Sequence, residues 1–181
     1  MNLIYETERL ILQLEHQGAA NEVLHFYMRN KAYFEPFEIT RPDNFYTLPY
    51  HTVSLSFEYN QFIKKQAFRF WIYEKENRLT PIGCVSASNL KRGAFLSCDL
   101  AYKIDHDKTN KGYATEACCK MLDIIQRELG FHRVLLHIMP SNKSSLRIAD
   151  KLGFQYEGMD FSFALISGKW EDHLRYSLVF S

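Results

Sequence analysis

The sequence contains no long apolar run. No window approaches the ~18 apolar residues that a membrane-spanning helix needs. The first residues, MNLIYETERLILQLE, combine acidic side chains with alternation, whereas a signal or transit peptide has a basic flank and a continuous apolar core. We therefore expect no membrane partner and a cytoplasmic location.

An excess of one charge is also missing. The 22 Lys and Arg residues nearly balance the 21 Asp and Glu residues, which leaves a net charge of +1. A protein that binds nucleic acid or anionic lipid over a large surface usually carries a strong positive charge. We expect no direct nucleic acid partner.

Disulfide and metal-binding patterns are absent too. The four cysteines, Cys84, Cys98, Cys118 and Cys119, show no CxxC spacing, and two of them are neighbours on a predicted helix. This usage is typical of a reducing cytosol, and we expect the cysteines to be small buried apolar residues. The seven histidines form no HExxH motif and no i,i+4 pair, so no metal site is expected.

Aromatic residues, in contrast, are abundant. They make up 15% of the 181 residues, with 14 Phe and 11 Tyr, which predicts a core or a cleft rich in rings. The length suits one domain over residues 1–181, and no repeat or linker divides it. A monomer and a homodimer both remain open.

The first third of the chain has mainly helical patterns. Arg9 to Glu15 alternates and predicts a half-buried strand with Leu10, Leu12 and Leu14 on one side. Helices are expected at Ala19–Met28 and at Tyr50–Lys65. Between them, Asn30–Thr47 has prolines, acids and rings without a period, which predicts an ordered surface loop whose aromatic residues belong either to the core or to a substrate groove.

Strand patterns dominate the rest of the chain. Three runs with short connections predict an antiparallel meander: Ala67–Glu74, Ile82–Ser88 and Ala94–Ile104. After a helix, HRVLLHIMP reads as a strand that can lie parallel to the third of them. Ser141-Asn142 then offers N-cap chemistry for a short helix that Gly153 closes. The runs Tyr156–Ile166 and Asp172–Phe180, joined at SGKW, predict a C-terminal hairpin.

The stretch Leu100–Leu129 is the centre of the prediction, because a strand, a polar loop and a helix follow one another there. The helix begins after Gly112 and is expected to end at Gly130. Glu116 with Lys120 and Asp123 with Arg127 are expected as exposed i,i+4 pairs. One face is apolar at helical spacing: Ala114, Ala117, Cys118, Met121, Leu122, Ile125 and Leu129.

A helix start of this kind can bind an anion. Its first N–H groups have no partner within the helix, they carry a partial positive charge, and glycine lets a ligand approach the backbone. From the residues alone, Lys111-Gly112 either holds a phosphate or only turns the chain into the helix.

The segment KTNKGYATEA resembles the loop by which GNAT superfamily acetyltransferases, in the RimJ/RimL branch, hold the pyrophosphate of coenzyme A. Gly112 and Ala114 match the family pattern, Thr109 stands where the family has Gln or Arg, and Asn110 replaces a common glycine. The resemblance implies cofactor contacts from this loop, whose residues are Thr109, Asn110, Lys111, Gly112, Tyr113 and Ala114. Lys111 could instead be solvated, and Tyr113 could be a packing residue.

A second segment, PSNKSSLRIADKLGF, resembles the family's next motif at Asn142, Ser145, Gly153 and Phe154. The resemblance implies that Asn142 touches the pantetheine arm and that Ser145 lies near the thioester sulfur. Read by themselves, the same residues are helix caps. Many family members protonate the leaving thiolate with a tyrosine where this chain has Ala149, so the acid must be Ser145, a water or another tyrosine such as Tyr156.

Membership would imply a mixed α/β (α+β) GNAT fold. Its central twisted sheet is mostly antiparallel with one splayed parallel pair, and helices cover both faces. Backbone groups of Tyr102, Lys103 and Ile104 would then be free for the pantetheine amides of acetyl-CoA. Asp99 is the expected general base, with Glu116 and Glu38 as the next candidates. Alternatively, Asp99 is an exposed strand carboxylate and Glu116 a favourable first-turn charge.

The expected reaction moves acetyl from acetyl-CoA to the α-amine of a protein N-terminus, such as that of a ribosomal protein. An α-amine with a pKa of ~7.7–8.0 needs little help from a base, unlike a lysine at ~10.4. One alternative acceptor is an aminoglycoside or polyamine, for which Glu35, Glu38 and Asp43 could form an acidic groove. In a second alternative the chain has no acceptor, because it is a non-catalytic CoA-binding or ribosome-assembly factor.

Overall fold

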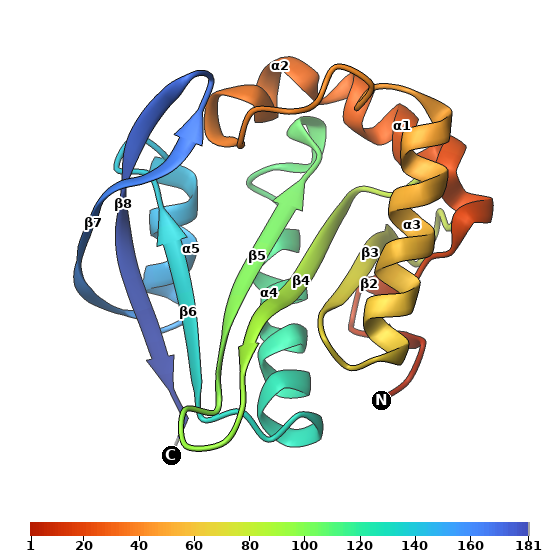
Figure 1. Cartoon of the computed structure of the whole chain (residues 1–181). Helices are drawn as coiled ribbons and strands as arrows, with labels where there is room; N and C mark the ends of the chain where they lie inside the picture. Colours follow the sequence, from red (N-terminus) through yellow and green to blue (C-terminus); the bar gives the residue numbers. More distant parts are fainter. Residues whose placement is uncertain (181) are drawn as a thin grey trace.

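The computed structural model describes residues 1–180, in which eight strands form one sheet in the order β1-β2-β3-β4-β5-β6-β8-β7 (Figure 1). All neighbours are antiparallel except β5 and β6, which are parallel. The strands are β1 (Ile4–Glu6), β2 (Leu10–Gln13), β3 (Phe68–Glu74), β4 (Gly83–Lys91), β5 (Ser97–Ile104), β6 (Arg133–Ile138), β7 (Gln155–Ile166) and β8 (Lys169–Val179).

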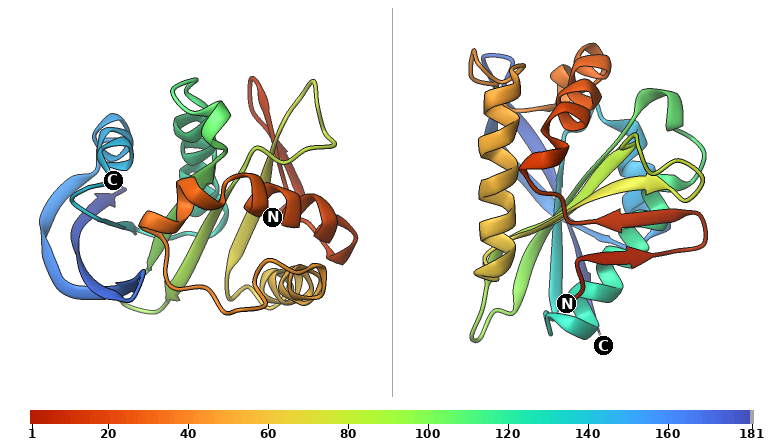
Figure 2. Two further views of the ribbon diagram at one scale, coloured as in Figure 1. Left: turned by 90° about the horizontal axis from the view of Figure 1, so that it is seen from above. Right: turned by 90° about the vertical axis from the view of Figure 1, so that its right-hand side faces the viewer.

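Helices cover both faces of this sheet. Figure 2 shows α4 and α5 on one face and α3 on the other, while α1 and α2 cross the end at which β5 finishes. The helices are α1 (Ala20–Arg29), α2 (Lys31–Phe34), α3 (Leu48–Ile63), α4 (Tyr113–Asp123) and α5 (Lys143–Lys151). Single turns add η2 (Glu35–Phe37) after α2 and η3 (His106–Lys108) before the loop that leads into α4. No helix within residues 1–180 combines the length and the apolarity that crossing a bilayer would take.

The sheet therefore has a core on each face. Under α4, the buried residues Met121 and Ile125 pack with Phe70 and Val85 of the sheet. The opposite core, under α1 and α3, is built around Trp71 and other rings. Because apolar layers lie on both sides, the prediction of a half-buried first strand is wrong: Leu10, Ile11 and Leu12 of β2 are all at most 1% exposed.

The parallel strands β5 and β6 meet over a short length only. Their register contains three residue pairs, Ser97 with Arg133, Cys98 with Val134 and Asp99 with Leu135. Beyond these pairs the strands separate, as Figure 1 shows toward the end covered by α2. The remaining residues of each strand leave backbone groups facing a gap in the middle of the sheet.

The predicted meander, the parallel strand, the hairpin and the helices at Ala19–Met28 and Tyr50–Lys65 are confirmed. The interpretation of Asn30–Thr47 as a loop is wrong in part, because α2 and η2 lie within it. Strand β1 was not predicted; three residues are too few to show a period.

Details of the central helix also differ from the prediction. Lys120 pairs with Asp123 at 3.6 Å, so the expected Glu116–Lys120 pair is wrong, whereas Arg127 does pair with Asp123 at 2.8 Å. From Ile124 to Glu128 the helix widens into a π turn. Three cysteines are buried as expected, but Cys119 is exposed, since it lies on the side of α4 that turns away from the sheet.

Candidate active site

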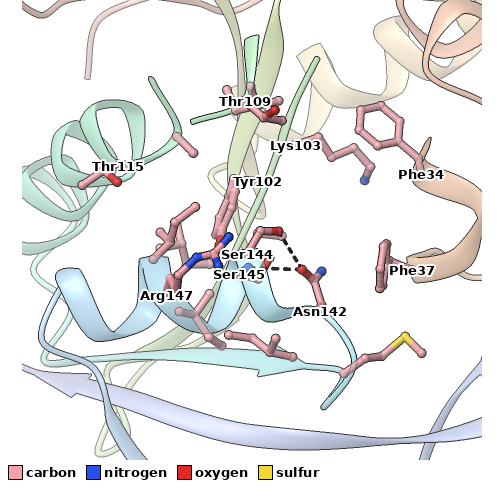
Figure 3. A pocket seen from close by; sticks show the side chains of 18 of the residues that line it. Phe34, Phe37, Tyr102, Lys103, Thr109, Thr115, Asn142, Ser144, Ser145 and Arg147 are labelled. Atoms are coloured by element: carbon pink, nitrogen blue, oxygen red, sulfur yellow. Dashed lines mark hydrogen bonds between the residues drawn. The ribbon is translucent and has the colours of Figure 1, made fainter. Parts of the chain in front are cut away.

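A cavity of ≈ 390 Å³ lies in the gap between β5 and β6. Its walls include residues 100–104 of β5 and 136–138 of β6, the loop and first turn of α4 and the outer side of α5. On the other face of the sheet, Tyr33, Phe34, Phe37 and Glu38 of the α2 and η2 region complete the lining. The cavity thus reaches through the sheet, and Figure 3 shows groups from the two faces opposite one another.

The α4 helix begins at one wall of this cavity. Gly112 is its N-cap with φ +82°, a conformation that side chains other than glycine rarely adopt. No side chain of the described residues caps this helix, so the first-turn N–H groups of Tyr113, Ala114 and Thr115 point out without an intrahelical partner. These groups fit a diphosphate.

The side chain of Arg9, in the turn just before β2, supports this loop. It donates to the Lys111 carbonyl oxygen at 2.9 Å, and its guanidinium lies 4.7 Å from the centre of the Tyr113 ring. A Cβ at Gly112 would lie 3.2 Å from Arg9 Nη2, so glycine also leaves room for the support. Sequence reasoning missed Arg9, because the contact joins residues about a hundred positions apart.

Glu116 connects α4 to the turn between β1 and β2. Its carboxylate accepts from Thr7 Oγ1 at 2.6 Å and from the Arg9 backbone N–H at 2.8 Å, and it forms an ion pair with the Arg9 side chain at 2.7 Å. Burial tends to raise the pKa of Glu116, but these hydrogen bonds outweigh it and hold the pKa below its usual value. The interpretation of Glu116 as a reserve base finds no support here.

Other predicted side chains of the loop are held by the protein itself. Tyr113 donates its hydroxyl to Glu74 at 2.8 Å, and Thr109 donates to the His106 carbonyl at 2.9 Å. Asn110 has φ +59°, which explains an asparagine where the family often has glycine, because Asn tolerates this region. The loop therefore faces the cavity mainly with backbone.

The positive side chains at this part of the cavity come from α5 instead of from the loop. Arg147 lines the cavity, is exposed, and forms no ion pair with any carboxylate in residues 1–180 (Figure 3). It stands on the same wall as Lys151. Neither residue belongs to the motif pattern, so sequence reasoning did not single them out.

Asn142 and Ser145 also lie on this wall. Asn142 caps α5, with its Oδ1 accepting from the Ser145 N–H at 3.1 Å and from Ser144 Oγ at 3.0 Å. The Ser145 hydroxyl takes no part in capping. It is therefore free to act at the cavity.

The Tyr102 side chain points toward α5, where Ser145 and Arg147 lie (Figure 3). Its hydroxyl is buried without a hydrogen bond of good geometry among the described residues. Burial raises the pKa of Tyr102, and the neighbouring Ser145 offsets this only in part. In contrast, Tyr156 is 57% exposed and lies against Tyr176 outside the cavity, so its proposal as the acid is wrong.

On the α2 side of the cavity, Glu38 and Lys103 form an ion pair at 2.9 Å, and Arg41 also contacts Glu38. Burial lowers the pKa of Lys103 to about 8, and the nearby cations Arg69 and Arg41 lower it as well. Glu38 is thus neutralised on both sides, although it lines the cavity as a base candidate would.

Asp99 lies apart from Ser145. Its carboxylate accepts from Asn89 Nδ2 at 2.7 Å and lines a second, more open hollow on the same face as Lys103. His137 of β6 lines both this hollow and the cavity. Sequence reasoning did not single out His137, because its neighbours in space come from β7 and β8.

A group of Asp105, His106 and Asp107 precedes the loop, and their side-chain atoms lie close enough to share an ion. Asp105 is already ion-paired with Arg29 at 2.5 Å and caps η3. This cluster orders the approach to α4.

The chain matches the family described as Acetyltransferase (GNAT) domain over residues 9–155. It belongs to the GNAT family and is an acetyl-CoA-dependent N-acetyltransferase.

Acetyltransferases of ribosomal proteins are among the proteins similar to this chain. The [ribosomal protein uS5]-alanine N-acetyltransferase of Escherichia coli is 32% identical over 169 residues, 93% of this chain and 86% of that protein. The crystal structure of the ribosomal-protein-S5-alanine acetyltransferase of Vibrio fischeri aligns with a TM-score of 0.92 at 27% identity, over 98% of this chain and 97% of that one. RimJ of Mycobacterium smegmatis, in complex with CoA-disulfide, shares the fold, with a TM-score of 0.88 at 20% identity over 94% of this chain and 81% of that one.

Proposed function

We propose that this enzyme transfers the acetyl group of acetyl-CoA to the α-amine of a protein N-terminus, with a ribosomal protein as acceptor. The observation that carries the proposal is the cavity that passes between β5 and β6. Thioester and amine can enter it from opposite faces and meet in the gap. The E. coli relative, which acts on a ribosomal protein alanine, supports this choice of acceptor. A cytoplasmic site of action follows from such an acceptor.

The cofactor side is assigned to α4, α5 and β5. We assign the diphosphate to the N–H groups of the loop from Thr109 to Ala114, with Arg147 nearby. The pantetheine amides are assigned to the backbone of Tyr102–Ile104, whose edge toward β6 is unpaired, and to Asn142. Bound there, the thioester supplies an activated acetyl carbonyl.

The chemical step needs positioning more than strong catalysis. The amine nitrogen attacks the thioester carbon, and unpaired backbone N–H groups at the gap are suited to stabilise the oxyanion that forms. The C–S bond then breaks. Tyr102 and Ser145 lie on the same wall and can hydrogen-bond the departing sulfur.

The acceptor side favours a single amine over a polycation. A polyamine or aminoglycoside would need an acidic groove, but Glu38 is neutralised by Lys103 and Arg41, and Glu35 lies 3.7 Å from Lys31. The rings of Tyr33, Phe34 and Phe37 suit the apolar side chain of a terminal residue such as alanine.

Thiol release from acetyl-CoA tests the proposal. We expect release with a peptide that begins with alanine, and little with the same peptide blocked at its N-terminus, with spermidine or with an aminoglycoside. Release with a small amine alone would move the acceptor to the small-molecule class. If calorimetry shows that CoA binds while no amine releases thiol, the chain is a binding module and the proposed activity is wrong.

A further inference from the structure

His137 lies at the gap between β5 and β6. It lies two positions after Leu135, the last β6 residue that pairs with β5, so it stands where the strands begin to separate. Along β6, Val134, Leu136 and Ile138 are buried in the core under α4 and α5, and His137 alternates with them onto the acceptor face. Its ring lines the cavity there.

The ring is fixed in one orientation. His137 Nδ1 lies 3.1 Å from Asp160 Oδ2, and Arg175 holds the other oxygen of Asp160. Since a carboxylate only accepts, Nδ1 carries the proton and Nε2 keeps its lone pair. The Phe163 ring stacks on His137 at 4.4 Å with an interplanar angle of 8°.

A bulge in β7 makes this arrangement. Asp160 pairs with His173 and Ala164 with Glu171, so β7 has extra residues between the two pairs. Ser162 in the bulge has φ +48°, and its N–H donates to Asp172 at 2.8 Å. Bulges near active sites often redirect a side chain, and this one places Asp160 and Phe163 on the same histidine.

We propose that His137, oriented by Asp160, is the general base that takes the proton from the acceptor amine; this rests on the proposed function. The ammonium gives one proton to Nε2, and the imidazolium releases it to water in the adjoining hollow. The neutral nitrogen then attacks, and the N–C bond forms. As the C–S bond breaks, the second proton passes from nitrogen to the thiolate, so the products are an acetylated amine, CoA thiol and one released proton. His137 is the catalytic residue, and Asp160 is a positioning residue.

Charged groups surround His137 on every side that packs against it. They are Asp160 on β7, His173 and Arg175 on β8, Asp99 on β5, and the Glu38–Lys103 pair across the cavity. His173 contacts the same Phe163 ring, but its Nδ1 donates to the backbone carbonyl of Glu171 at 3.1 Å instead of to a carboxylate. Burial lowers the pKa of His173, so it is a neutral neighbour at pH 7.

The test is the pH profile of kcat/KM with an alanine-starting peptide. In the wild type the profile should level off at a lower pH than in His137→Gln, which should keep rising until the amine itself is neutral near ~8. The variant should lose about tenfold at pH 7 and regain nearly full activity at pH 9, because about a tenth of an amine of that pKa is neutral at pH 7. Asp160→Asn should lower kcat, because it favours the wrong tautomer, and leave KM for acetyl-CoA unchanged.

Two controls frame the result. His132→Gln removes an exposed histidine that lines neither the cavity nor the hollow, and its profile should match the wild type. Calorimetry with CoA checks that each variant is folded and binds. The proposal is overturned if the pH profile of His137→Gln equals that of the wild type. It is also overturned if Asp99→Asn, and not His137→Gln, shifts the rise of the profile to higher pH.

Nitrogen NMR of the CoA-bound wild type gives a readout that does not need turnover. His137 should appear as the Nδ1–H tautomer, and observation of the Nε2–H form would contradict its role as base. If the wild type turns over no amine at all, the proposed function fails, and that outcome is separate from a tautomer result.

Discussion

The two sides of the cavity are built from different kinds of groups. On the α4 and α5 side, the protein offers mostly backbone N–H groups from one continuous loop and helix start. On the side of α2 and β7, it offers side-chain pairs between distant parts of the chain, Glu38 with Lys103 and His137 with Asp160. Backbone recognition tolerates changes of side chain, whereas paired side chains do not. The α4 and α5 side should therefore tolerate more side-chain changes than the α2 and β7 side.

The largest effect is expected from a change in the backbone of the loop proposed to hold the cofactor. Gly112→Val forces a β-branched residue to φ +82° and should weaken CoA binding at least about 100-fold, since two or more phosphate contacts at ~1.5 kcal/mol each are lost. Calorimetry with CoA measures the loss.

Gly130→Val is the matched control for this change. Gly130 also has positive φ, at +68°, but it lies at the far end of the α4 region, away from the cavity. Both variants should lose about 1–3 kcal/mol of unfolding free energy from backbone strain. Equal loss of CoA binding in both would show that the loop geometry is not what holds the cofactor.

A smaller effect is expected where a side chain acts on the cofactor side. Tyr102→Phe should lower kcat about tenfold and leave KM for acetyl-CoA nearly unchanged, because a thiol of pKa ~8.5 leaves without full protonation. Ser145→Ala should lower kcat by a similar factor. If the two residues act as one unit, the fold loss of kcat in the double variant should be smaller than the product of the two single losses. Steady-state kinetics measure both constants.

Tyr156→Phe serves as its control, since this tyrosine is exposed and outside the cavity. Its kcat should equal that of the wild type. An unaltered kcat in Tyr102→Phe and Ser145→Ala would remove both from the protonation of the leaving group.

The smallest effect is expected from the exposed cation. Arg147→Gln should raise KM for acetyl-CoA about threefold at low salt, because exposed ion pairs contribute less than ~1 kcal/mol. The difference from wild type should shrink as salt is added.

Arg127→Gln is the comparison here, an exposed arginine paired with Asp123 away from the cavity. Its KM should not move. A salt-independent change at Arg147 would point to packing instead of charge.

The same contrast explains what could be predicted from the sequence. The helix start at the α4 loop and the cap at Asn142 could be predicted from the sequence because their chemistry is local. A glycine, a helix start and a cap lie within a few residues. The strands and helices followed from their periods for the same reason. Tyr102 was predicted only for its backbone, since nothing in one strand shows that its hydroxyl meets α5.

The acceptor side was out of reach because its geometry depends on tertiary packing. The partner of His137 is brought to it by a bulge in β7 that shows no pattern in the sequence. Glu116 looked like a free first-turn acid until the fold placed Arg9 against it. Asp99 was chosen for its strand, yet its side chain faces the second hollow instead of the wall that carries Ser145.

The short contact between β5 and β6 should affect how readily the enzyme is degraded by proteases. Within residues 1–180, the register of β5 with β6 contains three residue pairs, so local opening should begin at this boundary. A cofactor bound as proposed, from α4 to α5, would contact both halves and favour the closed form more strongly as its concentration rises above its Kd. When acetyl-CoA is scarce, as in starvation, the empty enzyme is the form more open to proteases, and its abundance should fall with the metabolite it consumes.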